Sequence, residues 1–316
     1  MALWPKKILV PVDMGELSML ALQYASAWAM ACGGQLTILL VEDYHLPSYV
    51  GMEIYSEVGK ILQREALKAP EKLRQFVQPY IHPLVKWECR LEKGLPAPTI
   101  LGISSQGEFE AIVMGTHGRS GLRKWLLGSV AEEVIHGTNI PVLTVRKMQE
   151  TVVHGGRGPL TVRNILCPVD DRPSDWNTLE VAGRLRRVFD AFLTVLKCHP
   201  LKEFESFTHR EDLVIRKQRF LDALPPSLHA PSPEVLLRGG DAAEVILREA
   251  DSLHSNLIVM GRGCRPFEGN AVVGTTALRV LRSAPCPVLI IPEAPLAWEK
   301  ELLGISVGYG KEGSDK

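Results

Sequence analysis

Hydrophobic and polar positions divide the first half of the chain into segments of two kinds. Continuous apolar runs, typical of strands that are buried on both faces of a parallel sheet, occupy residues 7–12, 36–41, 111–114 and 140–146. The segments between them predict helices, which we expect at residues 16–32, within 52–78, after Gly94 and at 129–137. Strands and helices that alternate in this way predict an α/β fold built on a parallel sheet.

One further strand has a different pattern. Apolar and charged side chains alternate over residues 85–91, where Val85, Trp87, Cys89 and Leu91 are separated by Lys86, Glu88 and Arg90. A period of two means that one face of the strand is buried and the other is exposed to solvent, as expected at the edge of a sheet. With this strand the first half supplies five strands joined by helical crossovers, which is a doubly wound arrangement.

The second half of the chain repeats the first. Ile8-Leu-Val-Pro-Val-Asp13 returns as Ile165-Leu-Cys-Pro-Val-Asp170, and Ile112-Val-Met-Gly115 returns as Ile258-Val-Met-Gly261. The offset is 157 residues from Asp13 to Asp170 and 146 from Gly115 to Gly261, so the second copy is 11 residues shorter between these landmarks. A repeat of this length predicts two tandem domains, at residues 1–147 and 163–292, with a linker at 148–162 and a tail at 293–316.

Composition narrows the class of protein. The formal net charge is zero, which gives no electrostatic reason to expect nucleic acid or an anionic membrane as a partner. The longest apolar stretches, such as 17–31, are too short and mixed to span a bilayer, and the chain starts too close to its first strand for a signal peptide. The six cysteines lack CxxC or Cys/His ligand spacing, so we expect reduced thiols. These features predict a cytoplasmic protein.

The most informative motif follows the fourth strand. Gly115 is followed after two residues by Gly118, and after nine more by Gly128-Ser129, where the next helix begins. Glycines at the carboxyl end of a parallel strand let backbone amides approach an anion closely. The spacing differs from that of a Walker loop and from the GxGxxG fingerprint. It resembles the nucleotide-binding motif of the universal stress protein family.

The resemblance covers roughly 5–147 and 163–292. It implies two tandem doubly wound parallel five-stranded sheets of the adenine-nucleotide α-hydrolase-like type, each with strand order 3-2-1-4-5. It also implies an ATP ligand, with Mg²⁺ carried by the phosphates, and a role in the stress response without efficient catalysis. Members of the family dimerise through the fifth strand, so we expect the two domains to form an intramolecular pseudo-dimer, and a homodimer is the other arrangement that the resemblance allows.

The resemblance and the glycine motif together give one set of candidate nucleotide-binding residues, all in the first copy. Asp13 is expected to face the ribose and adenine, Val41 to offer backbone groups to the adenine edge, and Arg119 to reach a terminal phosphate. The glycines would adopt positive φ and bring N–H groups to the phosphates, next to the amides of the helix that follows. The full set is Pro11, Val12, Asp13, Val41, Gly115, Thr116, His117, Gly118, Arg119, Ser120, Gly121, Gly128, Ser129 and Val130.

These positions also have purely structural interpretations. Asp13 and Glu16 have the spacing of a capping box, and Ser129 is a suitable N-cap. Val41 would then be an ordinary core residue, and the glycines an ordinary turn between a strand and a helix. A plain turn does not by itself explain the fixed distance from the glycines to Gly128-Ser129, which favours phosphate binding.

The second copy keeps the spacing of the motif but changes its residues. Gly261, Gly274 and Thr275 are retained, whereas Cys264 replaces the second glycine. A Cβ at a position that needs positive φ costs about 1 kcal/mol or more. Glu268 adds a negative charge that would repel a triphosphate. We therefore expect one nucleotide per chain, bound to the first copy. Because Gly261, Gly274 and Thr275 survive, the alternative for the second copy is weak binding or a smaller ligand such as AMP.

Three classes of function fit the sequence. The favoured hypothesis is an ATP-binding regulatory module of the stress response. The first alternative is an enzyme, either a slow ATPase or an adenylyl or phosphoryl transferase, although the chain has no Walker lysine and no second acidic metal box. The second alternative is a chaperone-like interaction protein that does not depend on nucleotide. A turnover assay separates the first alternative from the favoured hypothesis, and the affinity for ATP separates the second.

Overall fold

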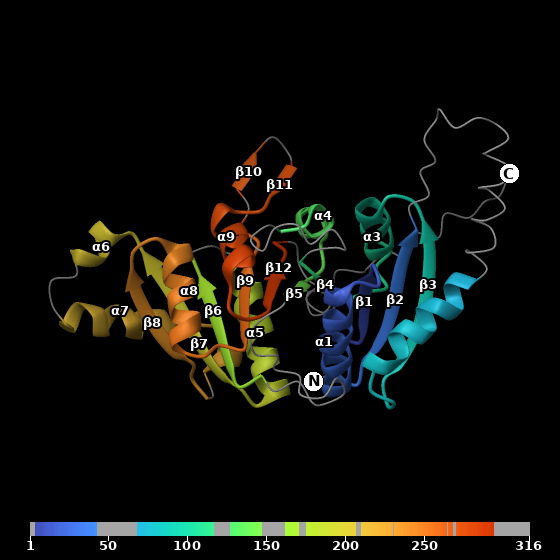
Figure 1. Ribbon diagram of the computed structural model, residues 1–316. Coiled ribbons are helices and arrows are strands. Elements are labelled where there is room, and N and C mark those ends of the chain that lie inside the picture. Colours follow the sequence, from blue (N-terminus) through green and yellow to red (C-terminus); the bar gives the residue numbers. More distant parts are fainter. Residues whose placement is uncertain are drawn as a thin grey trace, which may run out of the picture.

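The computed structural model describes residues 4–42, 68–116, 127–146, 162–170, 175–206, 210–229, 231–263, 265–267 and 270–293. The first copy has the alternation of strands and helices that its sequence predicts (Figure 1). Its elements are β1 (Lys7–Val12), α1 (Glu16–Cys32), β2 (Gln35–Glu42), a helical segment at 68–77 that ends in a 3-10 turn (Gln78–Tyr80), β3 (Lys86–Lys93), α3 (Pro96–Ser104), β4 (Ala111–Gly115), α4 (Ser129–Gly137) and β5 (Val142–Val145).

The second copy repeats this order of strands and helices. In it a short helix follows the second strand, and a hairpin of β10 and β11 stands between the fourth strand and the last helix, two places where the first copy lies outside the described residues (Figure 1). The elements are β6 (Asn164–Val169), α5 (Asp175–Phe189), β7 (Phe192–His199), α6 (Leu201–Glu205), α7 (Arg210–Asp222), a 3-10 turn (Pro226–Leu228), β8 (Glu234–Gly239), α8 (Ala242–Ser252), β9 (Leu257–Gly261), β10 (Arg265–Phe267), β11 (Asn270–Val272), α9 (Thr275–Ser283) and β12 (Val288–Ile291).

The two copies share one sheet. Its ten strands run in the order β3-β2-β1-β4-β5-β12-β9-β6-β7-β8, which is the order 3-2-1-4-5 in each copy, read inward from the two edges. All neighbouring strands within a copy are parallel, and β5 and β12 join the copies as an antiparallel pair in which Leu143 faces Leu289. The predicted pairing of the fifth strands is therefore confirmed, and β3, with its alternating pattern, lies at an edge as predicted.

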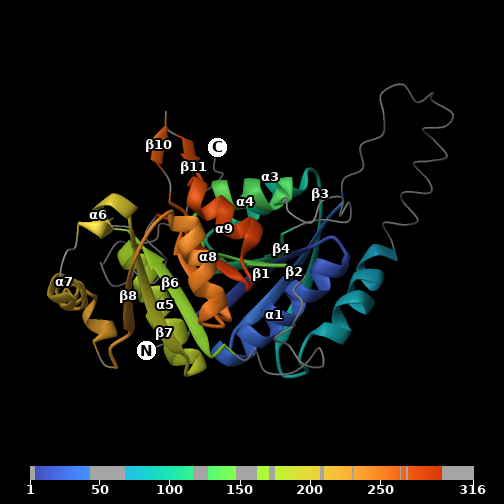
Figure 2. The ribbon, with the colours of Figure 1, turned by 60° about the vertical axis from the view of Figure 1, so that its left-hand side comes forward.

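Helices cover both faces of this sheet (Figure 2). Apolar side chains of α1, the segment 68–77 and α5 form one buried cluster, and those of α3, α4, α8 and α9 form another on the opposite face. Each cluster contains residues of both copies, so the hydrophobic core is continuous across the junction of β5 and β12. No helix among the described residues is long and apolar enough to cross a membrane.

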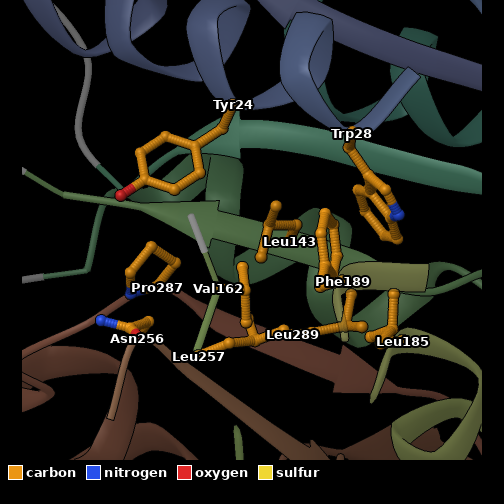
Figure 3. Close-up of a pocket in the computed structure, with 10 residues that line it drawn as sticks. All are labelled: Tyr24, Trp28, Leu143, Val162, Leu185, Phe189, Asn256, Leu257, Pro287 and Leu289. Carbon is orange, nitrogen blue, oxygen red and sulfur yellow. The ribbon is translucent and has the colours of Figure 1, made fainter. Parts of the chain in front are cut away.

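A small hollow marks the junction beneath β5 and β12 (Figure 3). Tyr24 and Trp28 point into it from α1, opposite Leu143, Leu289 and Phe189, and its volume is about 20 Å³. Burial raises the pKa of Tyr24 to about 12. A hollow of this size is far too small for a nucleotide, so it belongs to the packing between the copies.

Two arginines, one in each copy, donate hydrogen bonds to the last helix of the other copy. The Arg262 guanidinium, in the second copy, donates hydrogen bonds through Nη1 to backbone carbonyls at the carboxyl end of α4. In return, Arg146 of the first copy donates through Nη1 to the carbonyl of Arg282, near the end of α9. Cations at helix carboxyl ends pair with carbonyls that have no partner inside the helix.

His136, near the end of α4, should make stability depend on pH. Burial lowers the pKa of its imidazole, as does the neighbouring Arg262, while Glu132 opposes the shift. Since the folded-state pKa lies below the ordinary value of 6.5, the unfolded chain takes up this proton first as the pH falls. The contribution of neutral His136 is therefore complete above about pH 6.5 and is lost at lower pH.

We expect the free energy of unfolding to fall between about pH 7 and pH 5, and His136→Gln to flatten that part of the profile. Urea denaturation at a series of pH values measures this slope. His254 is exposed and serves as the control, because His254→Asn should leave the slope unchanged. An identical slope in wild type and His136→Gln would contradict the assignment.

Candidate nucleotide-binding cleft

A cleft of about 260 Å³ lies at the carboxyl ends of β1, β2 and β4, where α4 begins. The described members of the predicted set all line it: Pro11, Val12, Asp13, Val41, Gly115, Thr116, Gly128, Ser129 and Val130. The other candidates lie outside the described residues, namely His117, Gly118, Arg119, Ser120 and Gly121. In open parallel sheets, ligands bind where neighbouring strands send their crossovers to opposite faces, which is the boundary between β1 and β4 here.

One wall of the cleft is apolar. Leu39 and Met114 are buried strand residues with side chains on the face that α3 covers, and Ile100 of α3 packs against them. Pro96 and Val41 continue this wall toward solvent. Flat apolar surfaces of this kind suit the rings of a base. Part of the lining could not be predicted from the sequence, because it depends on which helix and strand residues the fold brings to one place. The additional lining residues are Ser18, Leu39, Pro96, Ile100, Met114 and Ala131.

Asp13 shapes the turn between β1 and α1. Its Oδ1 accepts hydrogen bonds from the backbone N–H of Gly15 (2.8 Å) and from the hydroxyl of Ser18 (2.6 Å). Ser18 Oγ in turn accepts a hydrogen bond from the backbone N–H of Asp13 at 2.9 Å. The capping-box interpretation of Asp13 and Glu16 is wrong, because Gly15 is the N-cap of α1 and no side chain caps it. Met14 lies between Asp13 and the N-cap, and its φ of 59° turns the chain before the helix begins.

Helix α4 presents its amino end to the cleft. Gly128 is its N-cap and Ser129 its first residue, so the interpretation of Ser129 as the N-cap is wrong by one position. The N–H of Gly128 is occupied, because it donates to the carbonyl of Thr116 at 2.6 Å. The next amides, of Ser129, Val130 and Ala131, have no acceptor within the helix, and no side chain of the described residues caps them. The positive end of the helix dipole lies at these amides, which suits an anion.

Gly115 is required for a reason other than the predicted one. The glycines with positive φ in the described chain do not include it, so the expectation that Gly115 adopts positive φ is wrong. A Cβ at this position would instead lie 2.7 Å from the Cβ of Leu17, in α1. The glycine therefore lets α1 approach the end of β4 closely.

Gly115→Ala should lower the free energy of unfolding by about 1–3 kcal/mol, because a methyl group has to push α1 away from β4. Gly102→Ala is the matched control in the same copy. Gly102 lies on the exposed side of α3 with no atom within 4 Å of an added Cβ. Alanine there should therefore raise the free energy of unfolding by about 0.5–1 kcal/mol. Urea denaturation of both variants checks the signs, and a neutral Gly115→Ala would refute the packing argument.

Comparison with known proteins identifies the family of the chain. The sequence model of the Universal stress protein family matches the chain twice, over residues 5–146 and 161–292. The chain belongs to the universal stress protein family. Universal stress protein MJ0531 of Methanocaldococcus jannaschii is 34% identical over 146 residues, which make up 45% of this chain and 82% of that protein. Universal stress protein MJ0577 of the same organism is 28% identical over 162 residues, covering 46% of this chain and 98% of that protein.

Solved structures show that the tandem fold recurs. A universal stress protein from Archaeoglobus fulgidus aligns with a TM-score of 0.62 at 20% identity, over 91% of this chain and 98% of that one. A protein of unknown function from Pseudomonas aeruginosa aligns with a TM-score of 0.61 at 19% identity, over 95% of this chain and 98% of that one. At these identities the likeness concerns the fold alone.

The second copy of this tandem universal stress protein repeats the backbone of the cleft but changes its charge. The N–H of Gly274 donates to the carbonyl of Arg262 at 3.0 Å, as Gly128 does to Thr116. Where Ser18 bonds the N–H of Asp13, the second copy has Asp175, whose carboxylate accepts from the N–H of Asp170 at 2.8 Å. A hydroxyl is thus replaced by an anion. Cys264 and Glu268, from which one nucleotide per chain is expected, lie outside the described residues.

Proposed function

We propose that the first copy binds ATP and that the chain acts as a nucleotide-dependent regulatory module. Membership of the universal stress protein family supports a general, regulatory role in the stress response. The observation that carries the proposal of ATP is the convergence, in one cleft, of an apolar wall, the Asp13 carboxylate and the open amino end of α4. These are the complements of a base, a ribose and a chain of phosphates.

Each part of the cleft has a role in this proposal. The base lies against Ile100 and Val41, and the ribose hydroxyls donate to Asp13. The phosphates accept hydrogen bonds from the first-turn amides of α4 and from the hydroxyl of Ser129, where the helix dipole favours negative charge. Mg²⁺ is carried by the phosphates in this scheme, since no group of three or more potential metal ligands occurs among the described residues.

The proposed module turns ATP over slowly or not at all. Among the described residues of the cleft, Asp13 is the one carboxylate, and its Oδ1 is engaged by Gly15 and Ser18 in the turn that precedes α1. Hydrolysis requires a group that orients water at the γ-phosphate, and this carboxylate is placed beside the sugar instead. Steady-state phosphate release should stay far below the ~10 s⁻¹ typical of enzymes. A rate near that value would support the ATPase alternative.

The second copy serves as a scaffold in this proposal. Its cleft has Asp175 where the first has Ser18, so a triphosphate there would face an additional negative charge. Analysis of nucleotide released from the purified, denatured chain by mass spectrometry tests the proposal. We expect an adenine nucleotide at no more than one equivalent per chain. Recovery of no nucleotide, together with no binding of added ATP, would refute it.

A further inference from the structure

We propose that Arg262 of the second copy is a positioning residue for the phosphate-binding end of α4 in the first copy. The inference rests on the proposed function. It assigns a task to the second copy that does not require a ligand of its own, namely to hold the helix whose amino end binds the phosphates.

The contact is specific and buried. Nη1 of Arg262 lies 3.2 Å from the carbonyl oxygen of Ile135, 2.8 Å from that of His136 and 3.0 Å from that of Thr138. Only 5% of Arg262 is exposed to solvent. One guanidinium therefore gathers carbonyls that the end of α4 leaves without partners inside the helix, and places a positive charge at the negative end of its dipole.

The length of α4 makes this contact relevant to the cleft. The helix has nine residues and is therefore about 13 Å long. Arg262 holds its carboxyl end, and the amides of Ser129, Val130 and Ala131 form its amino end. In so short a helix, a tilt or loss of the last turn moves the first turn as well. Phosphate binding depends on amides that point to one place, so it is the part of nucleotide recognition most sensitive to such a movement.

Arg262 is itself held at two points in the second copy. Its N–H donates to the carbonyl of Ile291 in β12 at 2.9 Å, and its carbonyl accepts from the N–H of Gly274 at 3.0 Å. Thr116 makes the equivalent backbone hydrogen bonds in the first copy, to the carbonyl of Val145 and from the N–H of Gly128, but its side chain is far shorter than that of arginine. The position thus keeps its structural role, and the second copy adds the guanidinium. The backbone of β11, in the second copy, also contacts α4.

The test compares two ligands and two arginines. Arg262→Met removes the guanidinium but keeps the apolar stem. We expect it to weaken ATP binding at least tenfold and to leave the affinity for adenosine unchanged, because adenosine has no phosphates for α4 to bind. Arg279→Met is the matched control. Arg279 lies on α9 in an exposed ion pair with Asp241 and Glu244, and its loss should change neither affinity.

Hydrogen exchange of the free protein provides a second readout that does not depend on nucleotide. Arg262→Met should speed exchange of the amides of α4 at least tenfold, without a comparable change in α8. Arg262→Lys keeps the charge, but its amino group lies one bond short of the place of Nη1, so it should give intermediate values of both ATP affinity and exchange. It also replaces the methionine variant if that variant does not fold.

The outcomes separate this inference from the proposed function. Equal losses of ATP and adenosine affinity would indicate general damage and overturn the positioning role, as would unchanged ATP affinity with unchanged exchange in α4. If wild type itself binds no ATP, the proposed function fails. The exchange arm still decides whether Arg262 positions α4: faster exchange supports it, and unchanged exchange overturns it.

Discussion

Ser129→Asp should weaken the binding of ATP at least about a hundredfold, which corresponds to ~2.7 kcal/mol, and leave the chain at least as stable as wild type. Ser129 is the exposed first residue of α4 and lines the cleft. A carboxylate in the first turn of a helix is favourable by about 0.3–1 kcal/mol, because it faces the positive end of the dipole. The same carboxylate would occupy the place proposed for the phosphates and repel them, at a cost of about 4 kcal/mol for two charges 4 Å apart near a protein surface.

Thr275→Asp is the matched control for this variant. Thr275 is the exposed first residue of α9 and has the same place in the second copy as Ser129 in the first. Thr275→Asp should bring the same gain in helix stability and leave the affinity for ATP unchanged. Calorimetric titration and thermal unfolding of both variants measure the two effects. An unchanged ATP affinity in Ser129→Asp, or an equal loss in both variants, would remove α4 of the first copy from the binding site.

Leu143→Ala should lower the free energy of unfolding of the whole chain by about 3 kcal/mol, within the range of 2–5 kcal/mol for buried leucines. Leu143 and Leu289 face each other across the antiparallel pair of β5 and β12 and are almost completely buried. Both line the small hollow between the copies, so the structure there is already imperfectly filled and a larger cavity would result (Figure 3). Because the core is continuous across this pair, both copies should unfold in one transition.

Leu84→Ala provides the comparison, since Leu84 is 74% exposed and its loss should change stability by less than about 0.5 kcal/mol. Urea denaturation followed by far-ultraviolet circular dichroism measures both variants. Two separate transitions, of which Leu143→Ala moves only one, would show that the copies are independent domains and that the junction contributes little to stability.

Much of the fold could be predicted from the sequence because its signals are local or repeated. The end of α1 at Cys32 follows from Gly33, which adopts φ of 61° and caps the helix in the left-handed conformation. The alternation over 85–91 placed β3 at an edge, and the apolar fifth strands predicted their own pairing. The helix end needs only the local glycine, and the edge position of β3 needs only the period of the pattern. The pairing of the fifth strands needs the rule that apolar edges are covered, together with the family resemblance.

The details of the cleft required the third dimension. That Gly115 is needed for the approach of Leu17 depends on where α1 crosses β4, and φ at Gly115 could not be inferred from the glycine motif alone. Asp175 was overlooked because its role emerges only when its carboxylate is seen on the N–H of Asp170. Arg262 follows a strand in one copy and binds a helix in the other, and no pattern along the chain indicates a contact of that range.

Calorimetric titration of ATP onto the wild-type chain, freed of bound nucleotide, tests the central claim most directly. The first copy has a hydroxyl at Ser18 where the second has the carboxylate of Asp175, and this difference predicts a stoichiometry near one ATP per chain. Two sites of equal affinity would contradict the asymmetry between the copies, and the absence of binding would contradict the assignment of the cleft.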